Sequence, residues 1–103
     1  MSLHRRNPKR DKNERSVINA FAKLGVKVWQ LSERGLPDLI LSDRGRLFLV
    51  EVKNGAGGSL TESQRLFFQT HPETPSYIVD DPDQAPDVLK SARTHYAGLP
   101  QLQ

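Results

Sequence analysis

The segment Leu47-Phe-Leu-Val-Glu-Val-Lys53 constrains the fold more than any other part of the chain. Successive side chains of an extended strand point to opposite faces. Both faces are apolar here: one carries Leu47 and Leu49, the other Phe48, Val50 and Val52. Such a strand belongs in a sheet that is covered on both sides. The segment ends with Glu51 and Lys53, and charges at the end of a buried strand need partners.

The rest of the chain supplies elements that can cover such a sheet. Periodic apolar residues predict a helix over 12–24, with Gly25 placed just after its end. Turn and strand patterns predict strands at 26–31, 38–42, 47–53 and 76–80, and helices from Thr61 to Pro72 and over 84–96. The order α-β-β-β-α-β-α indicates an α/β or α+β fold with a mixed sheet.

The length of 103 residues allows one domain with a small core. We expect a basic, disordered tail at 1–10, a single domain at 11–97 and a loose tail at 98–103. The absence of cysteine excludes disulfides, thiolate metal sites and cysteine nucleophiles. The three scattered histidines lack a paired spacing, which argues against zinc. No long apolar run or secretory signal is visible, so we expect a cytoplasmic protein with no membrane partner.

Positive charge is concentrated in the first half of the chain. The net charge is +3 at pH 7, but residues 1–53 carry a net +6 and residues 54–103 a net −3. Basic residues are densest near the N-terminus, at Arg5, Arg6, Lys9 and Arg10. Such a cluster suits nucleic-acid phosphates, and a solvated basic tail is an equal alternative. Arg44 and Arg46, near the tip of the central hairpin, are further candidate phosphate contacts or merely solubilising charges.

The hairpin formed by the two central strands determines which residues face each other. If its loop is symmetric about the Arg44–Gly45 bond, paired residue numbers add up to 89, and Asp38 lies opposite Glu51. Opposite Cβ atoms are about 5 Å apart, so the two carboxylates repel each other unless something offsets them. A divalent cation such as Mg²⁺ suits these oxygen ligands, and Lys53 can orient a water there. Alternatively, Asp38 merely begins a strand, and Glu51 and Lys53 form an exposed ion pair.

The order of these residues resembles a known motif. Gly35-Leu-Pro-Asp38, followed after twelve intervening residues by Glu51-Val-Lys53, resembles the PD-(D/E)xK nuclease motif. Over about residues 12–80 the chain resembles the virus-type replication-repair nuclease domain, VRR-NUC. The matching features are Glu14, Val26-Lys-Val-Trp-Gln30, Gly35–Ile40, Gly45–Lys53, a glycine-rich loop at 54–58 and Leu60-Thr-Glu-Ser-Gln64. The resemblance implies an α/β fold with a restriction-endonuclease-like core, and metal-dependent hydrolysis of phosphodiester bonds.

The resemblance also implies roles for the residues of the hairpin. Asp38 and Glu51 would bind the metal, Mg²⁺ or Mn²⁺, aided by the main-chain carbonyl of Val52. Lys53 would activate or position the attacking water.

Two further residues come from the flanking helices. The resemblance implies that Glu14 joins the metal shell directly or through water; alternatively, it is a first-turn acid stabilised by the helix dipole. It also implies that Gln64 lies close to the catalytic face, while the spacing of Gln64 from Thr61 fits a capping box, and both can hold. Gln30, at a strand end, is a weaker candidate.

These assignments predict a metal-dependent endonuclease of DNA. Free-standing members of the family resemble Holliday-junction resolvases and tend to be dimers, so we expect a homodimer that cuts branched DNA in repair. A bacterial or phage-infected cell suits such a protein. The alternatives are a nuclease of ordinary duplex or single-stranded DNA, and a basic nucleic-acid-binding protein without catalysis. Leu66, Phe67 and Phe68 are consecutive, so they form either a wide buried stripe, which we favour, or in part an interface.

Overall fold

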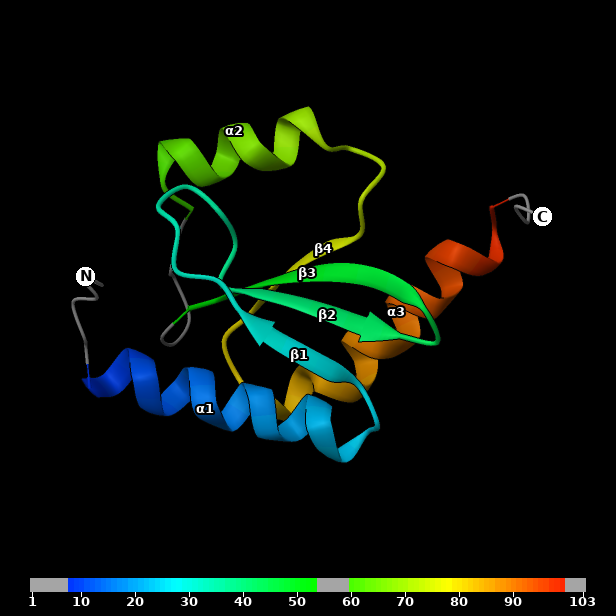
Figure 1. The fold of residues 1–103 in the computed structure, drawn as a ribbon, viewed down its shortest axis with the longest axis horizontal. Helices are drawn as coiled ribbons and strands as arrows, with labels where there is room; N and C mark the ends of the chain where they lie inside the picture. The colour runs from blue at the N-terminus through cyan, green and yellow to red at the C-terminus, as the bar shows by residue number, and fades with distance from the viewer. Residues whose placement is uncertain (1–7, 54–59, 100–103) are drawn as a thin grey trace.

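The computed structural model describes residues 8–53 and 60–99, with side chains from residue 12 onward. Its elements are α1 (Pro8–Lys23), β1 (Lys27–Gln30), β2 (Leu39–Asp43), β3 (Arg46–Val52), α2 (Glu62–Thr70), β4 (Ser76–Val79), the short 3₁₀ helix η1 (Pro82–Gln84) and α3 (Ala85–Ala97). The four strands form one sheet in the order β1-β2-β3-β4. The first three strands are antiparallel and β4 runs parallel to β3. The predicted mixed sheet and α/β class are confirmed (Figure 1).

Helix α1 begins at Pro8, so the predicted start at residue 12 is wrong. Proline is well tolerated in the first turn of a helix, where its missing N–H would have no helical partner. The predicted end is confirmed, because Gly25 adopts a φ of 84° and closes the helix. Its N–H donates to the carbonyl of Ala22, and the N–H of Val26 donates to that of Phe21. Residues 1–7, 54–59 and 100–103 lie outside the described part, so the disorder predicted for the tails there and the glycine-rich loop stay predictions. Residues 8–10, predicted as part of the disordered tail, are helical.

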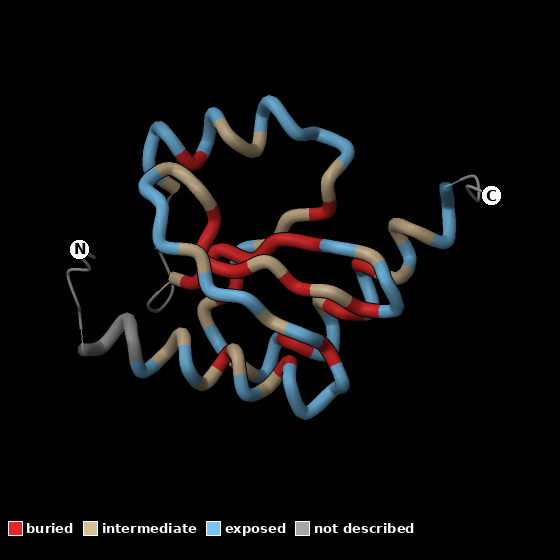
Figure 2. Tube along the Cα trace, in the orientation of Figure 1, coloured by how far each residue is buried: buried red, intermediate tan, exposed pale blue. Residues whose placement is uncertain are grey.

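The main core lies between the sheet and helices α1 and α3 (Figure 1). Strands β2 and β3 run through the most buried region of the chain (Figure 2). The ring of Phe48 on β3 packs edge-on against Phe21 of α1 and Tyr77 of β4, at centroid distances of 5.9 and 6.1 Å. Leu89 and Ala92 of α3 are buried in this core. This packing fixes the sheet on one side.

A partly buried ion pair attaches α3 to the sheet. The guanidinium of Arg93 donates to both carboxylate oxygens of Asp43, at 2.8 and 2.9 Å. The hydrogen bond and charge of Arg93 hold the pKa of Asp43 below its usual value despite its burial. The C-terminal segment, which carried no motif, is thus part of the same domain.

The opposite face of the sheet is only partly covered. Helix α2 lies on this side, across the sheet from α1 (Figure 1). Leu49 is buried there, but Leu47 is 49% exposed, so burial on both faces holds for the second half of β3 and not for its start. Leu66 is 60% exposed and Phe67 and Phe68 are half-buried, so the favoured wide buried stripe on α2 is wrong. Consecutive helical residues are about 100° apart and cannot all face one surface.

The hairpin between β2 and β3 has the predicted register. Ile40 pairs with Leu49 and Asp43 with Arg46, so the turn consists of Arg44 and Gly45. Both turn residues have positive φ, 56° and 78°, as in a type I′ turn. Within the described ranges, no helix is long and apolar enough to cross a bilayer.

We expect Gly35→Ala to destabilise the protein more than Gly25→Ala. Both glycines have a similar positive φ, 86° and 84°, where alanine costs about 1–2 kcal/mol. A Cβ at Gly35 would also lie 3.1 Å from the Cβ of Ser63 on α2, whereas one at Gly25 meets nothing within 4 Å. Urea unfolding of the two variants measures the difference. Equal losses of unfolding free energy would show that the close approach of residue 35 to α2 carries no cost.

Candidate active site

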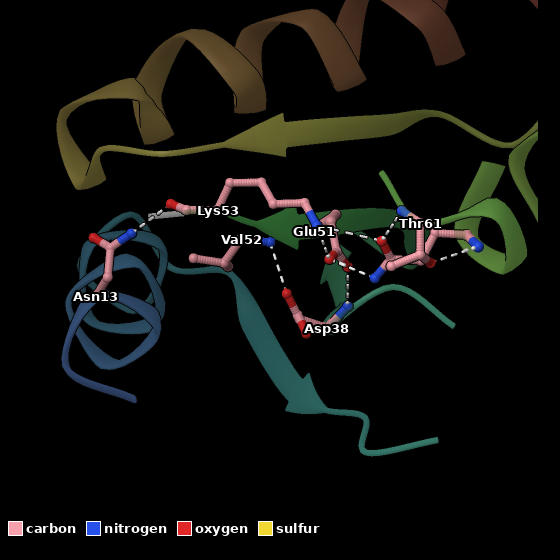
Figure 3. A network of polar contacts seen from close by, with 7 residues as sticks. Asn13, Asp38, Glu51, Val52, Lys53 and Thr61 are labelled. Atoms are coloured by element: carbon pink, nitrogen blue, oxygen red, sulfur yellow. Dashed lines mark hydrogen bonds and ion pairs between the residues drawn. The ribbon is translucent and has the colours of Figure 1, made fainter. Parts of the chain in front are cut away.

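The two predicted acids lie side by side where β2 begins and β3 ends. Asp38 directly precedes β2 and Glu51 is the penultimate residue of β3; they are 4% and 1% exposed. The N–H of Asp38 donates to Oε1 of Glu51 at 3.1 Å, and the N–H of Val52 donates to Oδ2 of Asp38 at 2.8 Å (Figure 3). The carboxylate of Asp38 thus accepts from an N–H of β3 that would bond to a main-chain carbonyl if β2 extended further towards its N-terminus. This end of the hairpin is held open by a side chain.

The carbonyl of Val52 is directed towards the same opening. The N–H groups of Leu49 and Lys53 donate to the carbonyls of Pro75 and Val79, on the β4 side of β3. Residues alternate in this respect along a strand, so the N–H and carbonyl of Val52 point to the β2 side, where Asp38 lies. Two carboxylates and one main-chain oxygen therefore meet at the end of the hairpin.

Gln64 joins α2 to Glu51 and Lys53. Its Nε2 donates to Oε2 of Glu51 at 2.6 Å, and its Oε1 accepts from Nζ of Lys53 at 3.3 Å. The same Oε1 accepts from the N–H of Thr61 at 3.0 Å, and the N–H of Gln64 donates to Oγ1 of Thr61 at 3.2 Å. The predicted capping box and the predicted position beside Glu51 are both present. The side-chain amide of Gln64 therefore caps the N-terminus of α2 and also orients Glu51 and Lys53.

The electrostatics of the pair disfavour two negative charges. Burial first, and then the charge of Asp38, raise the pKa of Glu51 above its usual value. Lys53, with Nζ 3.2 Å from Oε2 of Glu51, and the hydrogen bond from Gln64 act in the opposite direction. One ammonium thus offsets part of the repulsion, and a further cation between the acids would offset more. The ligand atoms that Asp38, Glu51 and the Val52 carbonyl offer a cation are all oxygens, which Mg²⁺ and Mn²⁺ favour.

Asn13 is a site residue that the sequence analysis missed. Its Nδ2 donates to the carbonyl of Lys53 at 2.8 Å (Figure 3). It also donates to the carbonyl of Asp80 at 3.4 Å, so Asn13 ties α1 to the ends of β3 and β4. Asn13 stands four residues before Val17 and eight before Phe21, both fully buried. That helical spacing marked Asn13 as inward-facing, and a polar residue on an inward face needs a partner.

Glu14 lies beside β1 and is hydrogen-bonded to Gln30. Its Oε2 accepts from Nε2 of Gln30 at 2.8 Å, and Gln30 pairs with Leu39, the neighbour of Asp38. Because α1 begins at Pro8, Glu14 is not in the first turn, where stabilisation by the helix dipole is greatest. Among the described residues, no three His, Asp or Glu side chains gather closely enough to hold a metal together. The metal role of Glu14 stays a prediction.

The candidate phosphate contacts are dispersed. Arg44 is exposed at the hairpin tip, whereas the guanidinium of Arg46 lies over the ring of Tyr96, 5.1 Å from its centroid. Arg5 and Arg6 precede the described part of the chain, and Lys9 and Arg10 are described only as helical backbone in α1. Their contact with DNA stays a prediction.

The comparisons with known proteins bear on the fold. No protein-family model matches the sequence, and no curated protein matches it. The structure is similar to a solved structure described as "VRR_NUC domain", with a TM-score of 0.68 and 22% sequence identity. The match covers 82% of this chain and 97% of that chain. The chain has a VRR_NUC-like fold. The fold implied by the motif resemblance is therefore confirmed, and the VRR_NUC-like fold extends over nearly the whole of the similar chain.

If Glu51 holds a metal ion, as the motif resemblance implies, replacing Gln64 with leucine should lower activity by roughly 10–100-fold, because partners that orient metal ligands typically contribute that much. Loss of its hydrogen bond also raises the pKa of Glu51 further. The acidic limb of the pH–rate profile should therefore move to higher pH. Thr61→Ala is the matched control: it breaks the capping box at a cost of about 1 kcal/mol without touching Glu51. A Gln64→Leu profile that overlays the Thr61→Ala profile would restrict Gln64 to capping.

Proposed function

We propose that the protein is a metal-dependent endodeoxyribonuclease that hydrolyses phosphodiester bonds in branched DNA. The observation that carries the proposal is the buried Asp38–Glu51 pair, in which burial and mutual repulsion raise the pKa of Glu51 while Lys53 contacts the same carboxylate. Two buried acids this close together destabilise a fold unless a cation neutralises their charge. The VRR_NUC-like fold supports the same activity.

The residues present fit Mg²⁺ or Mn²⁺. Asp38, Glu51 and the carbonyl of Val52 would hold the ion, and Glu14 would complete the shell directly or through water. When bound, such an ion polarises the scissile phosphate and lowers the pKa of a bound water. The protein's own contribution is to orient both carboxylates, through the Val52 N–H on Asp38 and the Gln64 amide on Glu51.

We assign to Lys53 the role of activating or positioning the attacking water. Its side chain is 17% exposed, and its Nζ is held between Oε2 of Glu51 and Oε1 of Gln64. An ammonium has three donors, so one remains for a water or a phosphate oxygen. A fixed positive charge at that point also stabilises the negative charge that develops as the bond breaks.

DNA is the partner we propose, and a homodimer is the form that we expect to bind it. The basic first half of the chain contains Asp38, Glu51 and Lys53 and supplies positive charge for phosphate neutralisation. A junction contains paired strands, whereas one small domain offers one site, so two copies suit a branched substrate. We place this activity in the cytoplasm of a bacterial or phage-infected cell.

Cleavage assays on a set of matched substrates test this function. The wild-type protein should cut a four-way junction or a flap with Mg²⁺ or Mn²⁺, more slowly cut duplex and single strands of the same sequence, and be inactive in EDTA. Light scattering should give the mass of a dimer. Equal cleavage of all substrates would favour an ordinary nuclease. Salt-sensitive binding without metal-dependent cleavage, identical in wild type and Asp38→Asn, would leave a nucleic-acid-binding protein without catalysis.

A further inference from the structure

The half-covered face of the sheet presents an exposed indole near the acids. Trp29 on the edge strand β1 is the chain's single tryptophan and is 50% exposed. It pairs with Ile40, and Ile40 pairs with Leu49, so these three side chains share a face. The alternate residue Val28 packs against the core beneath the other face. Burial on the inner face therefore leaves Trp29 pointing outward, on the side where α2 lies.

The distance from Trp29 to the acids is a small multiple of the spacing between stacked nucleotides. The N–H of Leu31 donates to the carbonyl of Asp38, so the pairing of β1 with β2 continues two residues beyond Trp29 to the level of the acids. Two residues along a strand and one strand across place the Cα atoms of Trp29 and Asp38 roughly 8 Å apart. Stacked nucleotides repeat about every 3.4 Å along one strand. A base on the indole would thus lie a few nucleotides or fewer from a phosphate at Asp38.

The charge around Trp29 fits a polyanion better than a second protein surface. Lys27, two residues away on the same face of β1, is exposed, and Ser42 lies opposite it. The described strands place no carboxylate on this face between Trp29 and the acid pair. Lysine is depleted from the centres of protein interfaces, whereas a cation next to an aromatic ring is typical of surfaces that bind single strands.

We propose that Trp29 is a stacking platform for an unpaired base close to the scissile phosphate, which makes it a specificity-determining residue for DNA with single-stranded segments. The assignment of a scissile phosphate rests on the proposed function; the binding of an unpaired base does not. Bases within a duplex present only their edges, so an indole on an open face selects strands whose bases are free to stack. This selection operates at junctions, flaps and single strands and not at blunt duplex.

Fluorescence tests the proposal directly, because all tryptophan emission of this chain comes from Trp29. Titration of the wild-type protein in EDTA with a short oligo-dT strand should quench the emission saturably, and a blunt duplex should quench it much less. Trp29→Ala should weaken oligo-dT binding about tenfold, measured by anisotropy of a labelled strand, and Trp29→Phe should restore most of the affinity. Leu47→Ala, an equally exposed apolar residue on the same face, should bind like wild type.

Two binding results would overturn the inference. One is unchanged oligo-dT affinity in Trp29→Ala. The other is emission that shifts to shorter wavelength with protein concentration and does not respond to oligo-dT, which would assign Trp29 to contact with a second copy of the chain. Quenching with no metal-dependent cleavage would overturn the proposed function alone. Metal-dependent cleavage with the same flap-to-duplex ratio in Trp29→Ala and wild type would overturn the inference alone.

Discussion

Asp38→Asn should reduce metal-dependent cleavage about 10³-fold or more and leave the metal-free protein at least as stable as wild type. A metal ligand contributes several kcal/mol to the transition state, and each 1.4 kcal/mol is a factor of ten. Asparagine retains an oxygen that can accept from the N–H of Val52. It removes the charge that helps to raise the pKa of Glu51, so the metal-free fold loses a repulsion.

The pH dependence of stability separates this effect from general damage. A carboxyl group whose pKa is raised by folding stabilises the fold at low pH, and this contribution is lost as the pH rises through its folded-state pKa. Asp38→Asn should flatten that loss, as measured by urea unfolding in EDTA across the acidic to neutral range. Metal binding by calorimetry should disappear in the same variant.

Asp43→Asn is the matched control for Asp38→Asn. It replaces another buried aspartate at the opposite end of β2, where Arg93 lowers the carboxyl pKa. A lowered pKa stabilises the fold above the unfolded-state value, so Asp43→Asn should lose stability at neutral pH and retain cleavage per folded molecule. Opposite signs in the two variants are the expected result. If both variants lost stability at neutral pH, the result would contradict the view that Asp38 is kept for function at the cost of repulsion with Glu51.

Lys53→Met should lower cleavage by roughly 10²–10³-fold while the protein still binds Mn²⁺. The change removes the ammonium and keeps a side chain of similar length, and loss of a positioned proton donor or acceptor typically has effects of this size. Lys53 lowers the pKa of Glu51, so its loss raises that pKa. Because the metal binds the ionised carboxylate, the Mn²⁺ binding curve should move to higher pH.

Calorimetric titration with Mn²⁺ at several pH values, alongside single-turnover cleavage, measures both effects. Lys90→Met, at an exposed position on α3, removes one positive charge away from the acids and should match wild type in both assays. A Lys53→Met variant that cuts like wild type, or that binds no Mn²⁺ even at high pH, would contradict the division of roles between Lys53 and the two acids.

The parts of the site that depend on local pattern were predictable from the sequence. A two-residue turn fixes the register of a hairpin, and the register alone placed Asp38 opposite Glu51. The capping box at Thr61 is likewise a local spacing. The position of Gln64 beside Glu51 came only from the motif resemblance, because nothing local specifies how α2 sits over the sheet.

The features that escaped prediction depend on contacts between distant segments. Asn13 meets Lys53 across forty residues, and Arg93 meets Asp43 across fifty. Neither pairing has a periodicity to reveal it. The exposure of Leu66 is of the same kind, since an apolar residue on a helix is buried only if another element reaches it.

The dual role of Gln64 links the assembly of the site to the local stability of α2. Gln64 is the only residue of this helix that is buried, and its side chain both completes the cap and holds Glu51 and Lys53. Helices with few buried contacts open more readily than the core that they flank. Each opening of α2 removes these contacts. The free energy of that opening therefore sets the fraction of molecules in which Glu51 and Lys53 are correctly oriented at any moment. If an ion binds Glu51 as proposed, it should raise that fraction by favouring the closed helix.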